Sequence, residues 1–111
     1  MQFKASARYI RISPFKLRPL VDVVRGSTVD RALAFLRTCS IDRAKSIEKV
    51  IFSAYSNAVN LQQNVAMNDL VIKEIKVDQG PTFKYFKPSA MGRAQLQKKR
   101  LSHISVLLEK H

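Results

Sequence analysis

The segment between residues 80 and 100 constrains the fold most, because it is strongly basic and lies between two strand-like runs. It reads GPTFKYFKPSAMGRAQLQKKR and has no clean helical or strand periodicity. The run before it, LVIKEIKV at 70–77, is rich in β-branched residues, and the run after it, HISVLLE at 103–109, alternates in polarity. Both patterns are typical of strands. We therefore expect two strands joined by a long hairpin arm at approximately 80–102.

An arm of this length must extend beyond the body of a chain of 111 residues. About 11 residues on each side, at about 3.3 Å per residue, reach about 35 Å. The radius of gyration of the remaining body should be only about 12 Å. Residues 1–111 are expected to form a single domain. The alternative interpretation of the arm is a disordered basic loop, although long structureless loops are uncommon in compact domains.

One strand and three helices are predicted before the arm. Residues 3–9 alternate between apolar and polar side chains, as a half-buried strand does. Amphipathic helices are expected at about 14–25, 29–36 and 42–60, and Pro19 should kink the first helix or shorten its first part. The predicted fold is α+β, a three-stranded antiparallel sheet with three helices on one face and a long protruding β-hairpin.

The net charge of +12 points to a polyanionic partner. The charge gathers in residues 1–60 and 81–111, on either side of a nearly neutral segment at 61–80. Nucleic acid is the first expected partner and an acidic membrane surface the second. The longest apolar run has five residues, whereas a membrane-spanning helix needs about 20. No segment is therefore expected to cross a bilayer.

Basic residues interleaved with aromatic ones favour RNA in particular, because cations bind phosphates and rings stack on exposed bases. The candidate RNA-binding residues are Arg8, Arg11, Lys16, Arg18 and Arg25 in the body, Lys84, Lys87, Arg93, Lys98, Lys99 and Arg100 in the arm, and His103 beside it. For the body residues the alternative is a solvated face. Arg31, Arg37, Arg43, Lys45 and Lys49 are mixed with acids and are interpreted mainly as exposed helix surface. Asn57 and Asn60 fit either a helix C-cap or an RNA contact.

The sequence contains few residues in patterns typical of catalytic or metal-binding sites. One cysteine and two histidines do not make a usual zinc site. Three isolated glycines exclude the P-loop and the dinucleotide-binding fingerprint. No acid or nucleophile is visibly paired with His103. We expect no enzymatic activity, no metal and no cofactor.

Two groups of residues match the pattern of one family. In the arm these are Asp78, Gly80, Pro81, Lys84, Pro88, Ala90, Gly92, Arg93, Ala94, Lys99, Arg100, Ser102, His103 and Ile104. In the first part of the chain they are Ser13, Pro14, Lys16, Arg18, Asp22, Arg25, Gly26, Ser53, Ala54, Asn57, Ala58 and Asn60. With these residues the chain resembles the universal large-ribosomal-subunit protein L-twenty-two family. It departs from the family's pattern at Pro19, where an aliphatic residue is usual, at Phe15, Tyr85 and Ser89, where arginine is common, and at Gln79, where glutamate is usual.

The resemblance implies a structural constituent of the large ribosomal subunit, in the cytoplasmic ribosome of a bacterium or the stromal ribosome of a plastid. In such proteins the hairpin passes between segments of large-subunit ribosomal RNA, and its tip lines the nascent-peptide exit tunnel. The implied partners are that RNA, neighbouring ribosomal proteins and the nascent peptide, with the protein a monomer within the ribosome. The implied tunnel-lining residues are Tyr85, Phe86, Lys87, Pro88, Ser89, Ala90, Met91, Gly92 and Arg93.

The alternative function is that of a nucleoid-type protein that bends duplex DNA with basic β-arms. Such proteins insert an apolar wedge at a base step, and Pro88 near the arm tip invites the comparison. They work as symmetric dimers, whereas the helices of this chain suggest a monomer. The matching residues in the first part of the chain favour the ribosomal family.

Overall fold

The computed structural model describes residues 2–39, 41–61, 65–88 and 94–110, with the backbone alone at 83–88 and 94–99. The elements run in the predicted order of one strand, three helices and two strands. They are β1 (Gln2–Ile10), α1 (Pro14–Val24), α2 (Val29–Thr38), α3 (Asp42–Leu61), a short 3-10 helix η1 (Met67–Asp69), β2 (Leu70–Pro88) and β3 (Ala94–Lys110).

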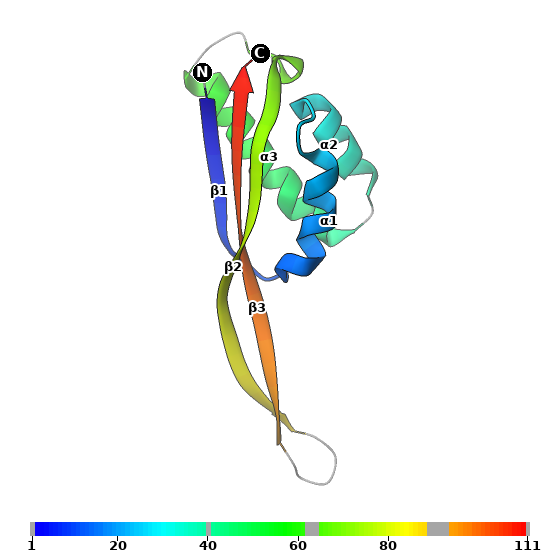
Figure 1. Ribbon diagram of the computed structural model, residues 1–111, viewed down its shortest axis with the longest axis vertical. Helices are drawn as coiled ribbons and strands as arrows, with labels where there is room; N and C mark the ends of the chain where they lie inside the picture. The colour runs from blue at the N-terminus through cyan, green and yellow to red at the C-terminus, as the bar shows by residue number, and fades with distance from the viewer. Residues whose placement is uncertain (1, 40, 62–64, 89–93, 111) are drawn as a thin grey trace.

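The three strands form one antiparallel sheet in the order β1-β3-β2, so that β3 is central. β1 pairs with β3 only as far as Ile10 opposite Ser102, whereas β2 stays paired with β3 as far as Pro88 opposite Ala94. The last part of β2 and the first part of β3 therefore leave the sheet as a two-stranded arm (Figure 1). The molecule is 63 Å long but only 25 Å and 18 Å across. The α+β fold with a protruding hairpin is confirmed.

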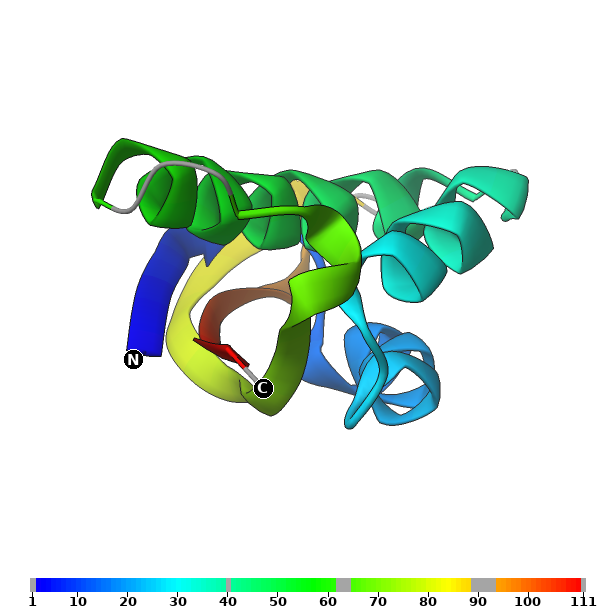
Figure 2. The ribbon, with the colours of Figure 1, turned by 90° about the horizontal axis from the view of Figure 1, so that it is seen from above.

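The helices cover one face of the sheet and leave the other face open (Figures 1 and 2). α3 lies against β1 and β3, α1 lies against β2, and α2 packs on α3. Along β3, Ile104, Val106 and Leu108 are buried under the helices, as their alternation predicted. The amphipathic helix predicted at about 42–60 is also confirmed, since the buried residues of α3 form one apolar seam made of Ala44, Ile47, Val50, Ile51, Ala54 and Ala58.

The first helix begins at Pro14, as predicted, and Pro19 does not shorten it, because α1 runs from Pro14 to Val24 with Pro19 inside it. Proline at this position removes the helical partner of the Phe15 carbonyl. Both residues are exposed, so water can replace the lost hydrogen bond. After the helix, Gly26 has a φ of 81° and its N–H donates to the carbonyl of Ile72 at 3.0 Å. Glycine accepts this left-handed conformation readily, and the turn fastens the end of α1 to β2.

The sheet is irregular where the arm begins. β1 changes its register against β3 between Ala7 and Ile10, and β2 changes its register between residues 79 and 82. At the first irregularity Tyr9 has a φ of 61° and is 60% exposed. The alternation had placed Tyr9 on the buried side of its strand, and that prediction is wrong because the bulge turns it outward. Its N–H donates to Nδ1 of His103 at 3.1 Å, and the two rings meet edge to face at 5.1 Å.

Candidate nucleic-acid interface

An electropositive pocket lies at the root of the arm. Four segments meet there: the loop after β1, the first turn of α1, the first turn of α3 and the arm part of β3. The pocket is open, has a volume of about 530 Å³, and is lined by Arg11, Ile12, Ser13, Lys16, Asp42, Arg43 and Arg100. Four of these residues are cationic and one is acidic. Both helices begin at the pocket, and helix N-termini carry partial positive charge. The pocket is therefore suited to an anion such as a phosphate group.

One hydrogen bond across the root of the arm holds the pocket together. Ser102 of β3 is fully buried, and its hydroxyl donates to the carbonyl of Ile12 in the loop before α1. Arg11 precedes Ile12 in the chain, and Arg100 is two residues before Ser102. The bond therefore keeps a cation of the body beside a cation of the arm, although 89 positions of sequence separate them.

Arg43 belongs to this pocket, although the sequence placed it on an exposed helix surface. It is half-buried, and its Nε is a buried donor without an acceptor among the described residues. Such a donor costs about 1–3 kcal/mol, so the site favours a ligand that can accept from the guanidinium. The available sequence signal was a cation in the first turn of a predicted helix. The position of that turn beside β3 depends on the tertiary fold.

A second group at the root of the arm is built around Phe15, in the first turn of α1. The ring is 67% exposed. The guanidinium carbon of Arg18 lies 5.7 Å from the ring centroid, and that of Arg100 lies 5.9 Å from it. Two candidates that the sequence placed separately in the body and the arm are thus brought to one aromatic ring. Arg100 also lines the pocket, so the ring and the pocket are neighbours.

Two of the predicted body cations lie away from the pocket. Arg25 is at the other end of α1, where its Nη1 pairs with Asp22 at 2.8 Å and its Nη2 donates to the carbonyl of Ile75 at 2.9 Å. This guanidinium fastens α1 to β2, so part of its donor capacity is used within the fold. Arg8 is exposed on β1, within the irregular stretch between Ala7 and Ile10.

Asn57 and His103 have partners within the protein. Asn57 lies inside α3 rather than at its end, and its Nδ2 donates to the carbonyl of Lys4 at 2.9 Å. It ties α3 to β1, which excludes the predicted C-cap. His103 accepts the N–H of Tyr9 and supports the bulge of β1. Asn60 is exposed on the last turn of α3.

The backbone register of the arm pairs basic positions of its two strands. Lys84 is directly opposite Lys98, and Phe83 is opposite Lys99. Like charges at opposed positions repel each other, and bound phosphates would relieve that repulsion. Of the predicted tip, Tyr85, Phe86, Lys87 and Pro88 form the end of β2. The other predicted tip residues, Ser89, Ala90, Met91, Gly92 and Arg93, lie outside the described residues.

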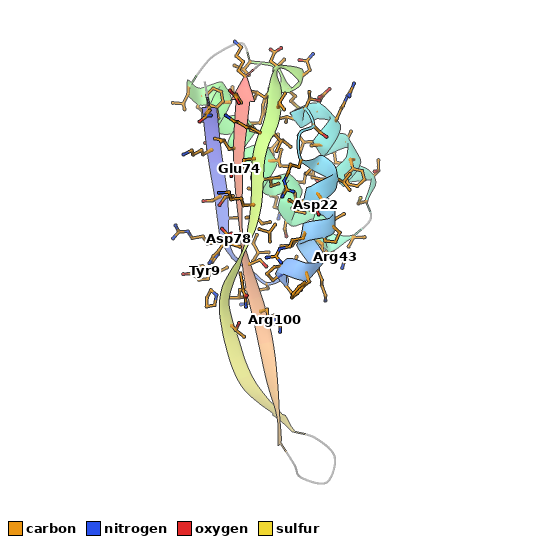
Figure 3. The ribbon with its side chains drawn as sticks, in the orientation of Figure 1. Tyr9, Asp22, Arg43, Glu74, Asp78 and Arg100 are labelled. Atoms are coloured by element: carbon orange, nitrogen blue, oxygen red, sulfur yellow. The ribbon has the colours of Figure 1, made fainter. Side chains whose placement is uncertain are left out.

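The open face of the sheet differs from the pocket because its charges are mixed. Lys73 pairs with Glu109 at 3.3 Å and Lys76 with Glu74 at 3.0 Å. The hydrogen bond from Lys76 to the Glu74 carboxylate raises the pKa of that lysine, and the charge of Asp78 adds to the effect. Glu74 and Asp78 lie along the same strand (Figure 3). A polyanion would meet carboxylates on this face, so the root of the arm is the better site for one.

The part of the chain that the structure describes holds no group of three or more His, Cys, Asp or Glu side chains placed to bind a metal ion. Within the same residues, no helix is both long and apolar enough to cross a membrane.

The sequence matches the family model described as ribosomal protein L22p/L17e over residues 5–109. It is 48% identical over 109 residues to large ribosomal subunit protein uL22 of Roseiflexus castenholzii, covering 98% of this chain and 96% of the relative. Identity to uL22 of Solibacter usitatus is 45% over 106 residues, covering 96% and 94%. For uL22 of Desulfitobacterium hafniense it is 48% over 109 residues, covering 96% and 93%. Since the matched region takes in both the body and the two strands of the arm, the chain belongs to the ribosomal protein L22p/L17e family.

Proposed function

We propose that this chain is a structural constituent of the large ribosomal subunit and binds large-subunit ribosomal RNA. The observation that carries the proposal is the family match over residues 5–109, which spans the body and both strands of the arm. The relatives named above are all bacterial, so we infer a bacterial, cytoplasmic ribosome. They give no support to the plastid alternative.

Members of this family are structural, non-enzymatic proteins, which confirms the prediction that the chain is not an enzyme. Nothing in the described residues favours the alternative of a DNA-bending protein. That function rested on the basic arm and on Pro88, and a ribosomal protein accounts for a basic arm equally well.

The proposed RNA contacts fall into two regions with different physical support. In the body, the pocket at the root of the arm offers four cations and two helix N-termini to phosphate groups. In the arm, β2 and β3 pair only with each other beyond Ser102, so this part gains no support from β1. Phosphate groups around the arm would reduce the repulsion between its opposed lysines. We infer that the arm lies within folded RNA and that its tip, residues 85–93, lines the peptide exit tunnel beside the nascent peptide.

The test is incorporation of tagged variants into large subunits, followed by sedimentation in high salt. The pocket variant is Arg11→Ala, Lys16→Ala and Arg43→Ala combined. The matched control removes the same charge from exposed helix surface outside the pocket, with Arg31→Ala, Arg37→Ala and Lys49→Ala. We expect the wild type and the control to sediment with large subunits and the pocket variant to be depleted. Absence of the wild-type chain from large subunits would refute the proposed function.

A deletion of residues 85–95, closed by a short turn, tests the role of the arm tip. The body should stay folded, because loop length changes stability only logarithmically. The deleted chain should still enter large subunits while a photo-crosslinker placed at position 91 of the full chain reacts with the nascent peptide. Loss of incorporation after the deletion, with normal incorporation of the pocket variant, would show that the two regions have the opposite roles.

A further inference from the structure

Phe15 is a large apolar side chain that lies outside the hydrophobic core and is exposed to solvent. It is 67% exposed, on the side of α1 that carries Arg18 rather than on the buried side with Leu17 and Val21. Packing in the core therefore does not account for a phenylalanine at this position. Among the described residues, two guanidinium groups lie near the ring, at 5.7 Å and 5.9 Å from its centroid. An exposed aromatic ring beside cations is the arrangement that proteins use to bind single-stranded nucleic acid.

The pocket beside the ring supplies a place for a phosphate group. Arg100 contacts the ring and also lines the pocket, so a ligand can reach both at once. The pocket volume of about 530 Å³ is in the range of small-molecule sites. Arg43 contributes a guanidinium whose buried Nε has no acceptor in the described part of the protein. The single carboxylate of the pocket, Asp42, is paired with Lys45 at 3.8 Å.

We propose that the root of the arm binds one unpaired nucleotide of RNA, with its base stacked on Phe15 and its phosphate held in the pocket by Arg43 and Arg100. This inference rests on the proposed function and adds to it the kind of nucleotide that is recognised. The base must be unpaired, because a base within a duplex has both faces covered by its neighbours and cannot offer one to the ring.

The consequence is a contact whose strength does not depend on salt. Arginine contacts to phosphate release counterions and weaken as salt rises, whereas base stacking on an aromatic ring releases none. Loss of a stacked base typically weakens binding by about 5-fold to 150-fold. Phe15→Leu should therefore lower the affinity for large-subunit ribosomal RNA by a factor in that range, with the salt slope unchanged. Arg18→Ala should reduce the slope by about 1.

Three variants of the full chain distinguish the effect of the aromatic face of Phe15 from the effect of its apolar volume. Phe15→Leu keeps an apolar side chain and loses the aromatic face, Phe15→Tyr keeps the face, and Val23→Ala alters another exposed apolar residue of α1. We expect weakened binding only for Phe15→Leu, with circular dichroism confirming that all three variants are folded. Equal affinities for wild type and Phe15→Leu would overturn the inference, as would equal weakening by Phe15→Tyr. Failure of the wild type to bind ribosomal RNA would instead refute the proposed function.

Fluorescence gives a direct measure of stacking, because the chain contains no tryptophan. Phe15→Trp introduces a single reporter at the site, and Val23→Trp introduces one on the same helix outside it. A single-stranded oligoribonucleotide of mixed sequence should quench the first reporter strongly and the second little. The same strand paired into a duplex, and polyglutamate of similar charge, should quench neither. Quenching of the first reporter by polyglutamate or duplex as strong as by the single strand would show a general polyanion site and overturn the inference.

Discussion

Ser102→Ala should loosen the junction between the arm and the body. The serine is fully buried and its hydroxyl donates to the carbonyl of Ile12. Removal of the donor leaves that carbonyl without its partner, which costs about 1–3 kcal/mol of the free energy of unfolding. A chain of this length is typically stable by about 6–17 kcal/mol, so the variant should still fold. Because the bond also keeps Arg11 beside Arg100, the affinity of the pocket for RNA phosphate should fall as well.

The assay is urea unfolding of the free protein, followed by circular dichroism. With a slope of about 2 kcal/mol per molar urea, the midpoint should fall by about 0.5–1.5 M. Ser105→Ala is the matched control, since this serine is on the same strand but is half-buried on the open face of the sheet. Its free energy of unfolding should change by no more than about 0.5 kcal/mol. If both variants unfold at the same urea concentration, the hydrogen bond of Ser102 does not stabilise the junction and the reasoning fails.

Three further predictions concern the root of the arm, a helix start and the charge of the whole surface. Gly80→Ala should lower the free energy of unfolding by about 1 kcal/mol or more, because an added Cβ would lie 3.1 Å from the backbone oxygen of Leu101; an unchanged urea midpoint would contradict this. The hydrogen bond from Thr28 lowers the pKa of Asp30, so its stabilising effect is present above the unfolded pKa of about 3.9 and disappears as pH falls through the lower folded pKa. Asp30→Asn should therefore reduce the loss of stability in acid, and identical acid-unfolding curves would refute the assignment. Affinity for ribosomal RNA should fall about 10³-fold to 10⁵-fold between about 50 and 200 mM salt if about 6–10 phosphates are contacted, whereas a salt-independent affinity would exclude electrostatic binding.

The local patterns of the sequence were sufficient to predict the elements and the layers of the fold. The alternation of Ile104, Val106 and Leu108 identified the buried side of β3, and the seam of α3 from Ala44 to Ala58 identified the covering helix. These patterns arise from the geometry of a single element, so they are visible along the chain. The prediction for Tyr9 was wrong because the orientation of this residue depends on a bulge that His103 supports from another strand.

The candidate site was predictable residue by residue but not as an assembly. Net charge and motif pointed to Arg11, Lys16 and Arg100, yet nothing in the sequence brings Arg11 near Arg100 across 89 positions. Arg43 was missed for a related reason, since acids beside it gave it the pattern of a solvated helix surface. The start of α3 lies at the root of the arm only because the helix packs across β1 and β3. Such convergence is a property of the tertiary fold.

Small changes of angle at the root of the arm produce large displacements at its far end. From Ser102 to Ala94 the arm part of β3 spans eight residues, or about 26 Å at about 3.3 Å per residue. A change of about 10° at the root would therefore displace the far end of this strand by about 5 Å, since displacement grows with that length. The bulge at Tyr9, the hydrogen bond of Ser102 and the close approach of Gly80 all lie at this root. The electropositive pocket lies there too, so the nucleotide that we propose to bind there would help to fix the direction of the arm.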